Sequence, residues 1–314
     1  MARFLIRRTG FLLLTLLLTS LLIFGMTRLL PGDVARVILG REAGEAALEA
    51  LREELGLNQP APLQYLAWLA DFVRGDWGES YSTRLPIREV VVERLGNSLM
   101  LAGLTLAMAV PLAVALGVLA GLREERPADQ VISIGALAVV GLPEFVTGLV
   151  LIEIFAFRLR WLPANSSIAP GAGVLEALPQ LVLPALTATL VLLAYIVRLT
   201  RAGVIEELRQ DYVRTAALKG LAPHRVIVGH VLRNALLPTV TVIAISLGWL
   251  ISGLIVVENV FNYPGLGRLL TFAIDRRDLP LLQAVAMITV LIFALANLAA
   301  DLIYAALNPR IRLG

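Results

Sequence analysis

The side chains that could do chemistry in this sequence are few, and their spacing rules out most catalytic arrangements. Lys219 is the only lysine, and Gly220 and Leu221 follow it in place of the G-x-x-x-x-G-K-[ST] pattern of a phosphate-binding loop. The two histidines, His224 and His230, have no H-E-x-x-H pattern and no third obvious ligand, so we expect no metal site. There is no cysteine for a disulfide or a thiolate site. We therefore expect a chain with no catalytic residues, no metal and no ATP site of its own.

A polar interval, residues 198–234, remains as the best candidate for a functional surface. At its centre, residues 211–221 read DYVRTAALKGL. We expect helix over residues 202–219, because Gly220 can adopt the left-handed conformation that ends helices, and a new helix from Pro223, whose fixed φ suits a first turn. We expect Thr215, Ala216, Ala217 and Gly220 to leave the backbone of the corner uncovered, so that a partner can approach closely, although a generic helical hairpin would look similar. The basic residues of the interval are Arg198, Arg201, Arg209, Arg214, Lys219, Arg225 and Arg233.

Composition indicates that the elements around this interval cross a membrane. Hydrophobic residues make up 58% of the 314 residues and charged residues 16%, against about 25% charged in soluble domains. A membrane helix needs roughly 20 mostly apolar residues. The first candidate could be the core of a signal peptide, but it is longer than usual and no A-x-A site follows, so we interpret it as a retained anchor. The six candidate segments are residues 11–30, 98–122, 131–157, 181–197, 236–257 and 281–307.

The placement of arginine predicts the orientation of these segments. All but one of the 27 basic residues are arginine, and they flank apolar segments instead of forming a continuous stripe, so we expect no nucleic-acid binding. Short cytoplasmic loops carry an excess of basic residues. This rule places residues 198–234 and both termini in the cytoplasm. It places the long segment 31–97 outside, where long loops translocate regardless of charge.

The external segment has helices of its own. Residues 45–55 combine strong helix formers with an apolar face and end at Gly56, which suits a helix C-terminus. Residues 63–73 form a second amphipathic pattern that could lie along the outer surface. The segment is either a solvated cap or a surface that contacts a ligand-carrying partner.

Ionisable residues within apolar segments are functional candidates. Glu144, beside Pro143, and Glu153 lie in the third segment, and we expect them near a translocation path. Glu144 is the better candidate for a cavity, whereas Glu153 fits either the outer interface or the pore. Pro111, Pro143 and Pro184 could each break a helix near such a path.

The stretch RTAALKGL resembles the cytoplasmic EAA-type loop of ABC importer permeases, in particular the RTARAKGL form of the dipeptide, oligopeptide and nickel branch. In that family the loop forms a short coupling helix that sits in a cleft of the ATP-hydrolysing subunit. The chain lacks the generic glutamate and first alanine of the motif, and Ala217 stands at the branch's second arginine place. The resemblance assigns coupling to Arg214, Thr215, Ala216, Ala217, Lys219, Gly220 and Leu221.

Matches to the same branch continue in order along nearly the whole chain. They are specific for the family and weaker for the transported solute. They comprise RLLPGD (28–33), ELGLNQP (54–60), GDWGESYSTRLPI (75–87), ERLGNSL (93–99), GLPEFVTGLVLI (141–152), LRWLPA (159–164), VVENVFNYPGLGRLL (256–270) and ALNPRIR (306–312).

The resemblance implies an all-α membrane protein with six transmembrane helices and the type I ABC importer permease fold. It divides the chain into an N-terminal helix with an extracytoplasmic segment (1–95), a five-helix permease domain with a cytoplasmic coupling loop at 198–237 (96–307), and a cytoplasmic tail (308–314). Such a chain would be one half of the path for peptides or a related small solute across the cytoplasmic membrane of a prokaryote.

The partners that the resemblance implies are a second permease subunit, two ABC ATPase subunits that hold ATP and Mg, and an extracytoplasmic solute-binding protein, all working in membrane lipid. A proton-coupled secondary transporter is the alternative. It would predict internal repeats and a relay of midplane carboxylates, of which the sequence gives little sign. A membrane enzyme would need a catalytic constellation that the chain lacks.

Overall fold

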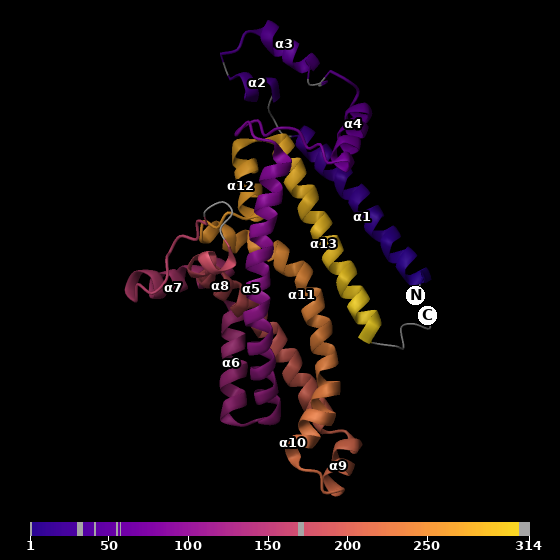
Figure 1. Cartoon of the computed structure of the whole chain (residues 1–314), viewed down its shortest axis with the longest axis vertical. Coiled ribbons are helices and arrows are strands. Elements are labelled where there is room, and N and C mark those ends of the chain that lie inside the picture. Colours follow the sequence, from indigo (N-terminus) through magenta and orange to yellow (C-terminus); the bar gives the residue numbers. More distant parts are fainter. Residues whose placement is uncertain are drawn as a thin grey trace. The chain divides into compact units, whose positions relative to one another are not determined.

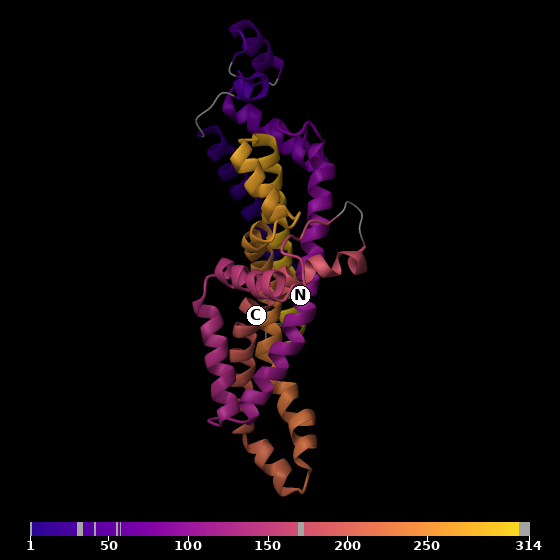
Figure 2. The ribbon, with the colours of Figure 1, turned by 90° about the vertical axis from the view of Figure 1, so that its left-hand side faces the viewer.

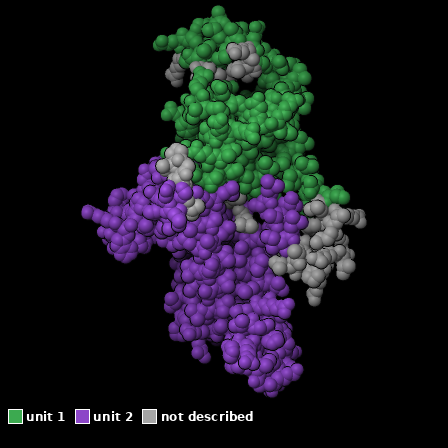
Figure 3. Space-filling view, viewed as in Figure 1, with its two compact units in different colours: residues 1–97, 265–294 green, residues 98–264, 295–314 purple. Residues whose placement is uncertain are grey.

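The computed structural model describes residues 2–29, 34–40, 42–54, 56, 58–168 and 173–307, and these residues are mostly helical. Within them, β-structure is limited to one isolated antiparallel bridge between Glu79 and Pro86. The chain divides into two compact units (Figure 3). Unit 1 comprises residues 1–97 and 265–294, and unit 2 comprises residues 98–264 and 295–314. The predicted tail, 308–314, lies outside the described residues, and the three-part division of the chain stays a prediction.

Unit 1 contains the helices that precede residue 98 and those that follow Gly265. Its apolar core joins Ile87 and Val91 of α5 to residues of α12 and α13, among them Leu269, Leu281 and Val285. Its helices are α1 (Ala2–Leu29), α2 (Val34–Leu39), α3 (Glu45–Glu54), α4 (Ala61–Arg74), α12 (Leu266–Arg276) and the first parts of α5 (Ile87–Leu122) and α13 (Leu279–Leu307).

The two predicted helices of segment 31–97 are confirmed. Helix α3 ends at Glu54, one residue short of the predicted Leu55, which lies outside the described residues. Gly56 follows with φ +64°, a left-handed conformation that glycine adopts at little cost. Helix α4 ends in the same way at Gly75, whose φ is 84°.

Residues 76–86, which we call the 76–86 loop, are held by one buried carboxylate of unit 1. Asp278 is fully buried. Its Oδ2 accepts hydrogen bonds from Ser80 Oγ at 2.6 Å and from the Ser82 N–H at 2.9 Å. Its Oδ1 accepts the Leu281 N–H at 3.3 Å, as a cap at the start of α13. Asp278 thus links the loop to the corner between α12 and α13.

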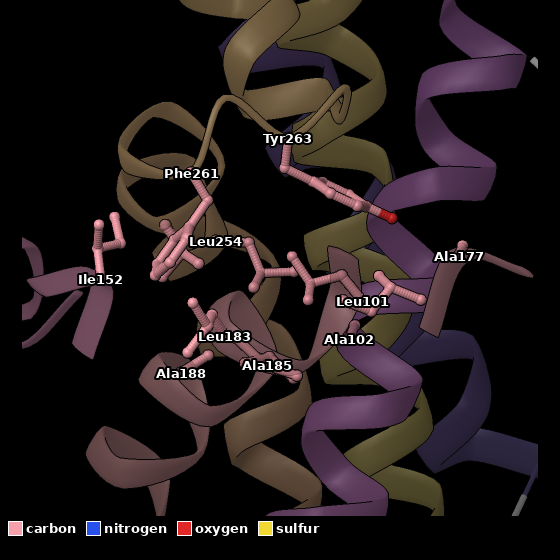
Figure 4. Packing of buried hydrophobic residues seen from close by; sticks show 13 residues of the cluster. Leu101, Ala102, Ile152, Ala177, Leu183, Ala185, Ala188, Leu254, Phe261 and Tyr263 are labelled. Atoms are coloured by element: carbon pink, nitrogen blue, oxygen red, sulfur yellow. The ribbon is translucent and has the colours of Figure 1, made fainter. Parts of the chain in front are cut away.

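Unit 2 contains the rest of the helices (Figures 1 and 2). Its central apolar cluster joins Leu101 of α5, Leu183 of α8 and Leu254 of α11 to Phe261 and Tyr263, which follow α11 (Figure 4). The helices are the remainder of α5 and α13, with α6 (Pro127–Gly141), α7 (Glu144–Leu151), the π-helix η1 (Ile152–Arg158), α8 (Val174–Leu208), α9 (Asp211–Leu218), α10 (Pro223–Val226), the π-helix η2 (Ile227–Val231) and α11 (Leu232–Val260).

Glycines allow three close helix contacts in unit 2. Gly117 and Gly121 of α5 form a G-x-x-x-G pair against α8, where an added Cβ would lie 2.6 Å from the Cβ of Thr200 and 2.7 Å from that of Val204. An added Cβ at Gly203 of α8 would lie 2.5 Å from the backbone oxygen of Ala235 in α11. These positions therefore require glycine for packing.

Five helices of the described residues are long and apolar enough to cross a membrane, and a bent pair brings the number to six if it counts as one span. The bent pair is the third predicted segment. Helix α6 and the helical stretch from Glu144 to Arg158 meet at 106°, so the predicted break at Pro143 is confirmed. Pro143 caps α7 at this bend. Pro111 and Pro184 lie inside continuous helices, so the predicted breaks at these two prolines are wrong.

Candidate functional site

The polar interval folds as a helix, a corner and a helix at one end of unit 2 (Figure 1). The expected single helix over residues 202–219 is interrupted, because α8 ends at Leu208 and α9 begins at Asp211. Between them Gln210 has an extended backbone, with φ −74° and ψ 144°, which turns the chain. Helix α9 is consequently a separate short helix.

Backbone hydrogen bonds close the turn after α9. The Lys219 N–H donates to Thr215 O at 3.1 Å, the Gly220 N–H to Ala217 O at 3.0 Å, and the Leu221 N–H to Ala216 O at 3.3 Å. Gly220 has φ +78°, and α10 begins at Pro223. The predicted stop at Gly220 and restart at Pro223 are confirmed. We call residues 214–221 the coupling corner.

The inner face of α9 packs on an apolar cluster. Ala216, which is 8% exposed, lies with Val204 of α8, Val226 of α10, Val231 of η2 and Ala235 of α11. The prediction that Ala216 lies on the uncovered surface of the corner is therefore wrong. Its methyl group faces inward because α9 presents positions three residues apart, Val213 and Ala216, to the same side.

The outer face of the corner carries the other predicted residues. Arg214, Thr215, Ala217, Lys219 and Gly220 are exposed, and so is Leu221. Sequence reasoning missed Leu218, whose side chain is 81% exposed beside them. The signal for it was present: Leu218 falls two residues after Ala216 and so points away from the buried side of the helix. The outer face thus combines two cations, small side chains and an apolar tip.

Two ion pairs tie the surroundings of the corner to neighbouring helices. Arg201 of α8 makes a bidentate pair with the buried Asp129 of α6, with Nε–Oδ1 at 2.5 Å and Nη2–Oδ2 at 2.7 Å. Arg209 pairs with Glu124 at 2.8 Å. Sequence reasoning placed both arginines among the basic residues of the interval but gave neither of them a partner within the chain. A buried bidentate pair fixes geometry strongly, because removing one partner strands the other charge.

A tyrosine at the start of α9 closes a further polar contact. The Tyr212 hydroxyl donates to Glu207 Oε2 at 2.5 Å and accepts from Asn234 Nδ2 at 3.3 Å. Desolvation, followed by the hydrogen bond to Glu207, raises the pKa of Tyr212 above its usual value of 10.0. The phenol is therefore protonated at neutral pH and serves as a donor that links α8, α9 and α11.

The candidates for a translocation path lie at and beyond the α6–α7 bend. Pro143 is the residue before α7 and Glu144 is its first residue, with a half-buried side chain. Glu153 lies in η1 and pairs with Arg158 at 3.0 Å, where both side chains are exposed. Pro143 and Glu144 thus stand at the bend, and Glu153 lies more than two turns farther along the same helical stretch. Their role in translocation stays a prediction.

A buried carboxylate near the end of α11 was missed. Glu258 of α11 is 1% exposed and accepts a hydrogen bond from Ser98 Oγ at 2.6 Å. It stands one residue beyond the predicted end of the fifth segment, at 257, which is why hydropathy did not select it. A carboxylate in this position is worth attention because buried charges in membrane helices are rare.

Taken together, these features define a polytopic membrane subunit whose distinctive surface is a helical corner suited to mechanical contact. Among the described residues, no group of three or more His, Asp or Glu side chains is placed to hold a metal ion. The corner offers exposed backbone, two cations and an apolar tip, and it stands on a packed base. Such an arrangement leaves the outer face of α9 accessible while its inner face packs against α8 and α11.

Comparison with known proteins identifies the particular family. Residues 113–313 match the family described as "Binding-protein-dependent transport system inner membrane component", and residues 1–102 match the N-terminal family of such membrane components. The chain belongs to this family of ABC importer permeases, and it is a multi-pass protein of the prokaryotic inner membrane. This membership favours the importer over the secondary transporter.

Two curated relatives cover nearly all of the chain. The "Probable peptide ABC transporter permease protein y4tP" of Sinorhizobium fredii is 38% identical over 312 residues, which are 99% of this chain and 100% of that protein. The "Glutathione transport system permease protein GsiC" of Escherichia coli K12 is 37% identical, with 99% of each chain covered.

A solved structure supports the fold. A chain in a crystal structure of an amino acid ABC transporter with histidines has a TM-score of 0.50 and 16% identity, over 69% of this chain and 94% of that one. At this identity the likeness concerns the fold alone. The predicted fold class, an ABC importer permease built from transmembrane helices, is confirmed.

Proposed function

We propose that this permease forms half of the translocation path of a peptide importer and that its coupling corner docks in a cleft of an ATPase subunit. The names of the two relatives above, a peptide permease and a glutathione permease, support a peptide or small peptide-like solute. The observation that carries the coupling role is the corner itself. Its outer face is exposed, small and cationic, whereas its inner face is anchored on α8, η2 and α11.

The proposal includes the partners that such a corner needs. ATP and Mg would be bound by two ABC ATPase subunits, since the only lysine of this chain lacks a phosphate-binding sequence. A second permease subunit would complete the path, and a solute-binding protein would deliver the solute. In this arrangement both termini and the coupling corner face the cytoplasm, and residues 31–97 face the other side.

The bend at Pro143 supplies the candidate path. Within lipid, a broken helix is tolerated where its free backbone groups are buried in protein or line a water-filled cavity. We assign Pro143 and Glu144 to that lining. Glu153, which is already paired with Arg158 at the surface, would lie nearer the outer mouth.

The central experiment replaces Ala217, which is exposed on α9, by glutamate. Ala217→Glu leaves the buried cluster untouched and puts a bulky negative charge on the docking face. We expect normal membrane insertion, loss of the ATPase subunits on gentle purification, and loss of uptake. Gly220→Val should act in the same direction, because a β-branched residue at φ +78° is strained by roughly 1 kcal/mol or more and covers the exposed backbone.

The matched control is Ala202→Glu, the same change at an exposed position of α8 before the corner. It should retain the ATPase subunits. If Ala217→Glu and Gly220→Val both assemble and take up solute normally, the corner is only a connector and the coupling proposal fails. Uptake assays with di-, tri- and oligopeptides would separately test the solute class.

A further inference from the structure

Unit 1 contains a pocket of about 260 Å³ that plays no part in coupling. It lies between the last turns of α4, the residues that follow α4 and the first turns of α13. Three aromatic rings, Trp68, Phe72 and Trp77, and two carboxylates, Asp71 and Asp76, line it. Pockets that hold whole small molecules usually measure roughly 300 to 1,000 Å³. This pocket lies just below that range, so it has room for a single long side chain.

The aromatic wall is fixed in place. Phe72 and Trp77 stack with their ring centroids 5.4 Å apart and 15° between planes, and Trp68 lies 6.0 Å from Phe72. The Trp77 indole N–H donates to the Phe72 backbone oxygen at 3.1 Å, which sets the orientation of the ring. The rings thus present a preformed apolar surface, and the face of an aromatic ring attracts cations.

The two carboxylates lie where helix electrostatics disfavours them. Asp71 is in the last turn of α4 and Asp76 just follows it, next to the partial negative charge of the helix C-terminus. Asp76 accepts the Gly78 N–H at 3.1 Å, and Asp71 has only an exposed ion pair with Arg74, a kind of contact that contributes little. Arg88 lies beside Gly75, outside the pocket lining. The lining therefore has an excess of negative charge beside aromatic faces.

Resting on the function proposed above, we infer that this pocket receives the guanidinium or ammonium group of an arginine or lysine side chain of the solute-binding protein. Aromatic faces and carboxylates together are the chemistry that binds such a cation. The size of the pocket suits one protruding side chain and not a whole peptide. The segment that bears it, residues 31–97, is the surface on which we expect the binding protein to dock.

The first test uses the assembled complex in lipid nanodiscs and measures ATPase stimulation by increasing solute-loaded binding protein. In the Asp71→Asn/Asp76→Asn double variant, we expect the concentration of binding protein that gives half-maximal stimulation to rise about tenfold. Close charge contacts across interfaces change affinity by that factor or more. The basal and maximal rates should not change. Raising the salt concentration should weaken the binding of the solute-binding protein to the wild-type complex more than its binding to the variant.

The matched control is Glu79→Gln, which removes a neighbouring exposed carboxylate that does not line the pocket. Its half-maximal concentration should stay within about twofold of the wild type, since exposed charges outside the contact contribute little. If the double variant behaves like Glu79→Gln, the pocket is not part of the docking surface and the inference is overturned.

The second test separates the pocket from the proposed function. The full chain in detergent, with Trp161→Phe and Trp249→Phe so that Trp68 and Trp77 are its only tryptophans, is titrated with ethylguanidinium and with the neutral ethylurea, and tryptophan is excited selectively. We expect a fluorescence change with the cation only, and its loss in the Asp71→Asn/Asp76→Asn background. No change with the cation overturns the inference whatever the complex does.

The two tests together distinguish the ways in which the idea can fail. A response to ethylguanidinium with normal docking of the double variant would mean that the pocket binds free cations and not the partner, which overturns the docking role. A wild-type complex that no binding protein stimulates would overturn the proposed function, and the docking partner with it.

Discussion

The coupling corner and the 76–86 loop are both exposed segments, but different kinds of contact hold them. The corner rests on an apolar cluster in which Ala216 packs among valines of three elements. The 76–86 loop is held at Ser80 and Ser82 by hydrogen bonds to one buried carboxylate, Asp278, and at Trp77 by its stack on Phe72. The first support is apolar packing, whereas the second includes a polar anchor that depends on one residue.

The difference predicts how each segment responds to change. Apolar packing tolerates substitutions that keep size and polarity, and it fails when a charge or a large volume enters. A carboxylate that accepts several hydrogen bonds fails when that one group is altered, because the donors are then left unsatisfied. At the corner, the effect of a substitution should therefore depend on whether the residue faces the apolar cluster. At Asp278, it should depend on whether the new side chain can accept the same hydrogen bonds.

The largest effect is expected for Ala216→Glu. It would bury a charge without a partner in the cluster under the corner, and should lower the free energy of unfolding by about 4 kcal/mol or more. Thermal unfolding of the detergent-purified chain measures this. Ala217→Glu, one residue away on the exposed face, is the control and should leave the midpoint nearly unchanged. Equal losses in the two variants would contradict the packing described for α9.

Asp278→Asn is expected to destabilise unit 1 by roughly 2–3 kcal/mol, because an amide cannot accept all the hydrogen bonds that the carboxylate accepts. The 76–86 loop should open locally, so trypsin should cleave after Arg84, which is exposed on it, faster than in the wild type. Asp275→Asn removes an exposed carboxylate of α12 and serves as the control. Unchanged cleavage would show that Asp278 does not hold the loop.

Gly203→Ala should cost about 2 kcal/mol, since its Cβ would meet the backbone oxygen of Ala235 at 2.5 Å and backbone cannot move aside easily. The same change at Gly135 in α6, where an added Cβ meets nothing within 4 Å, should be neutral or stabilising. Unfolding midpoints of the two variants test the contact. A Gly203→Ala chain as stable as Gly135→Ala would place α8 and α11 farther apart than observed.

The smallest expected effect concerns Tyr81 in the 76–86 loop. Burial, and then the charge of Asp278, raises the pKa of Tyr81 above its usual value of 10.0. Because the folded pKa exceeds the unfolded one, the contribution to stability is present below pH about 10 and is lost as pH rises through the folded pKa. Ultraviolet titration of the wild type and of Tyr81→Phe should show that the pKa of Tyr81 is higher than that of a free phenol. Asp278→Asn should lower the pKa of Tyr81, but not to the value of a free phenol, because burial still raises it. If the pKa of Tyr81 does not change in this variant, the charge of Asp278 is not one of its causes.

Much of the fold could be predicted because its signals are local. Apolar length located the membrane segments, and glycine and proline marked helix ends, as at Gly75, Gly220 and Pro223. Proline was less reliable inside apolar segments. Pro111 and Pro184 stay within continuous helices, whereas Pro143 stands at a sharp bend. Membrane helices tolerate proline when neighbouring groups satisfy the freed backbone, and that depends on tertiary surroundings.

The parts that could not be predicted depend on contacts distant in sequence. Ser80 and Asp278 are separated by 198 residues, and Asp129 and Arg201 by 72. No local pattern pairs such residues. The inward orientation of Ala216 was within reach, since Val213 stands three residues before it, but α9 is so short that either face could have packed on the apolar cluster.

The bend at Pro143 also limits how much of a membrane's hydrocarbon layer helix α6 can cross. Helix α6 has 15 residues, and at about 1.5 Å per residue it rises roughly 22 Å. The hydrocarbon layer measures about 30 Å. Helix α6 is therefore too short to cross that layer alone, and the chain turns through 106° before it continues. If this bend lies within lipid, those of the last carbonyl groups of α6 that no N–H of the chain bonds require water or covering protein.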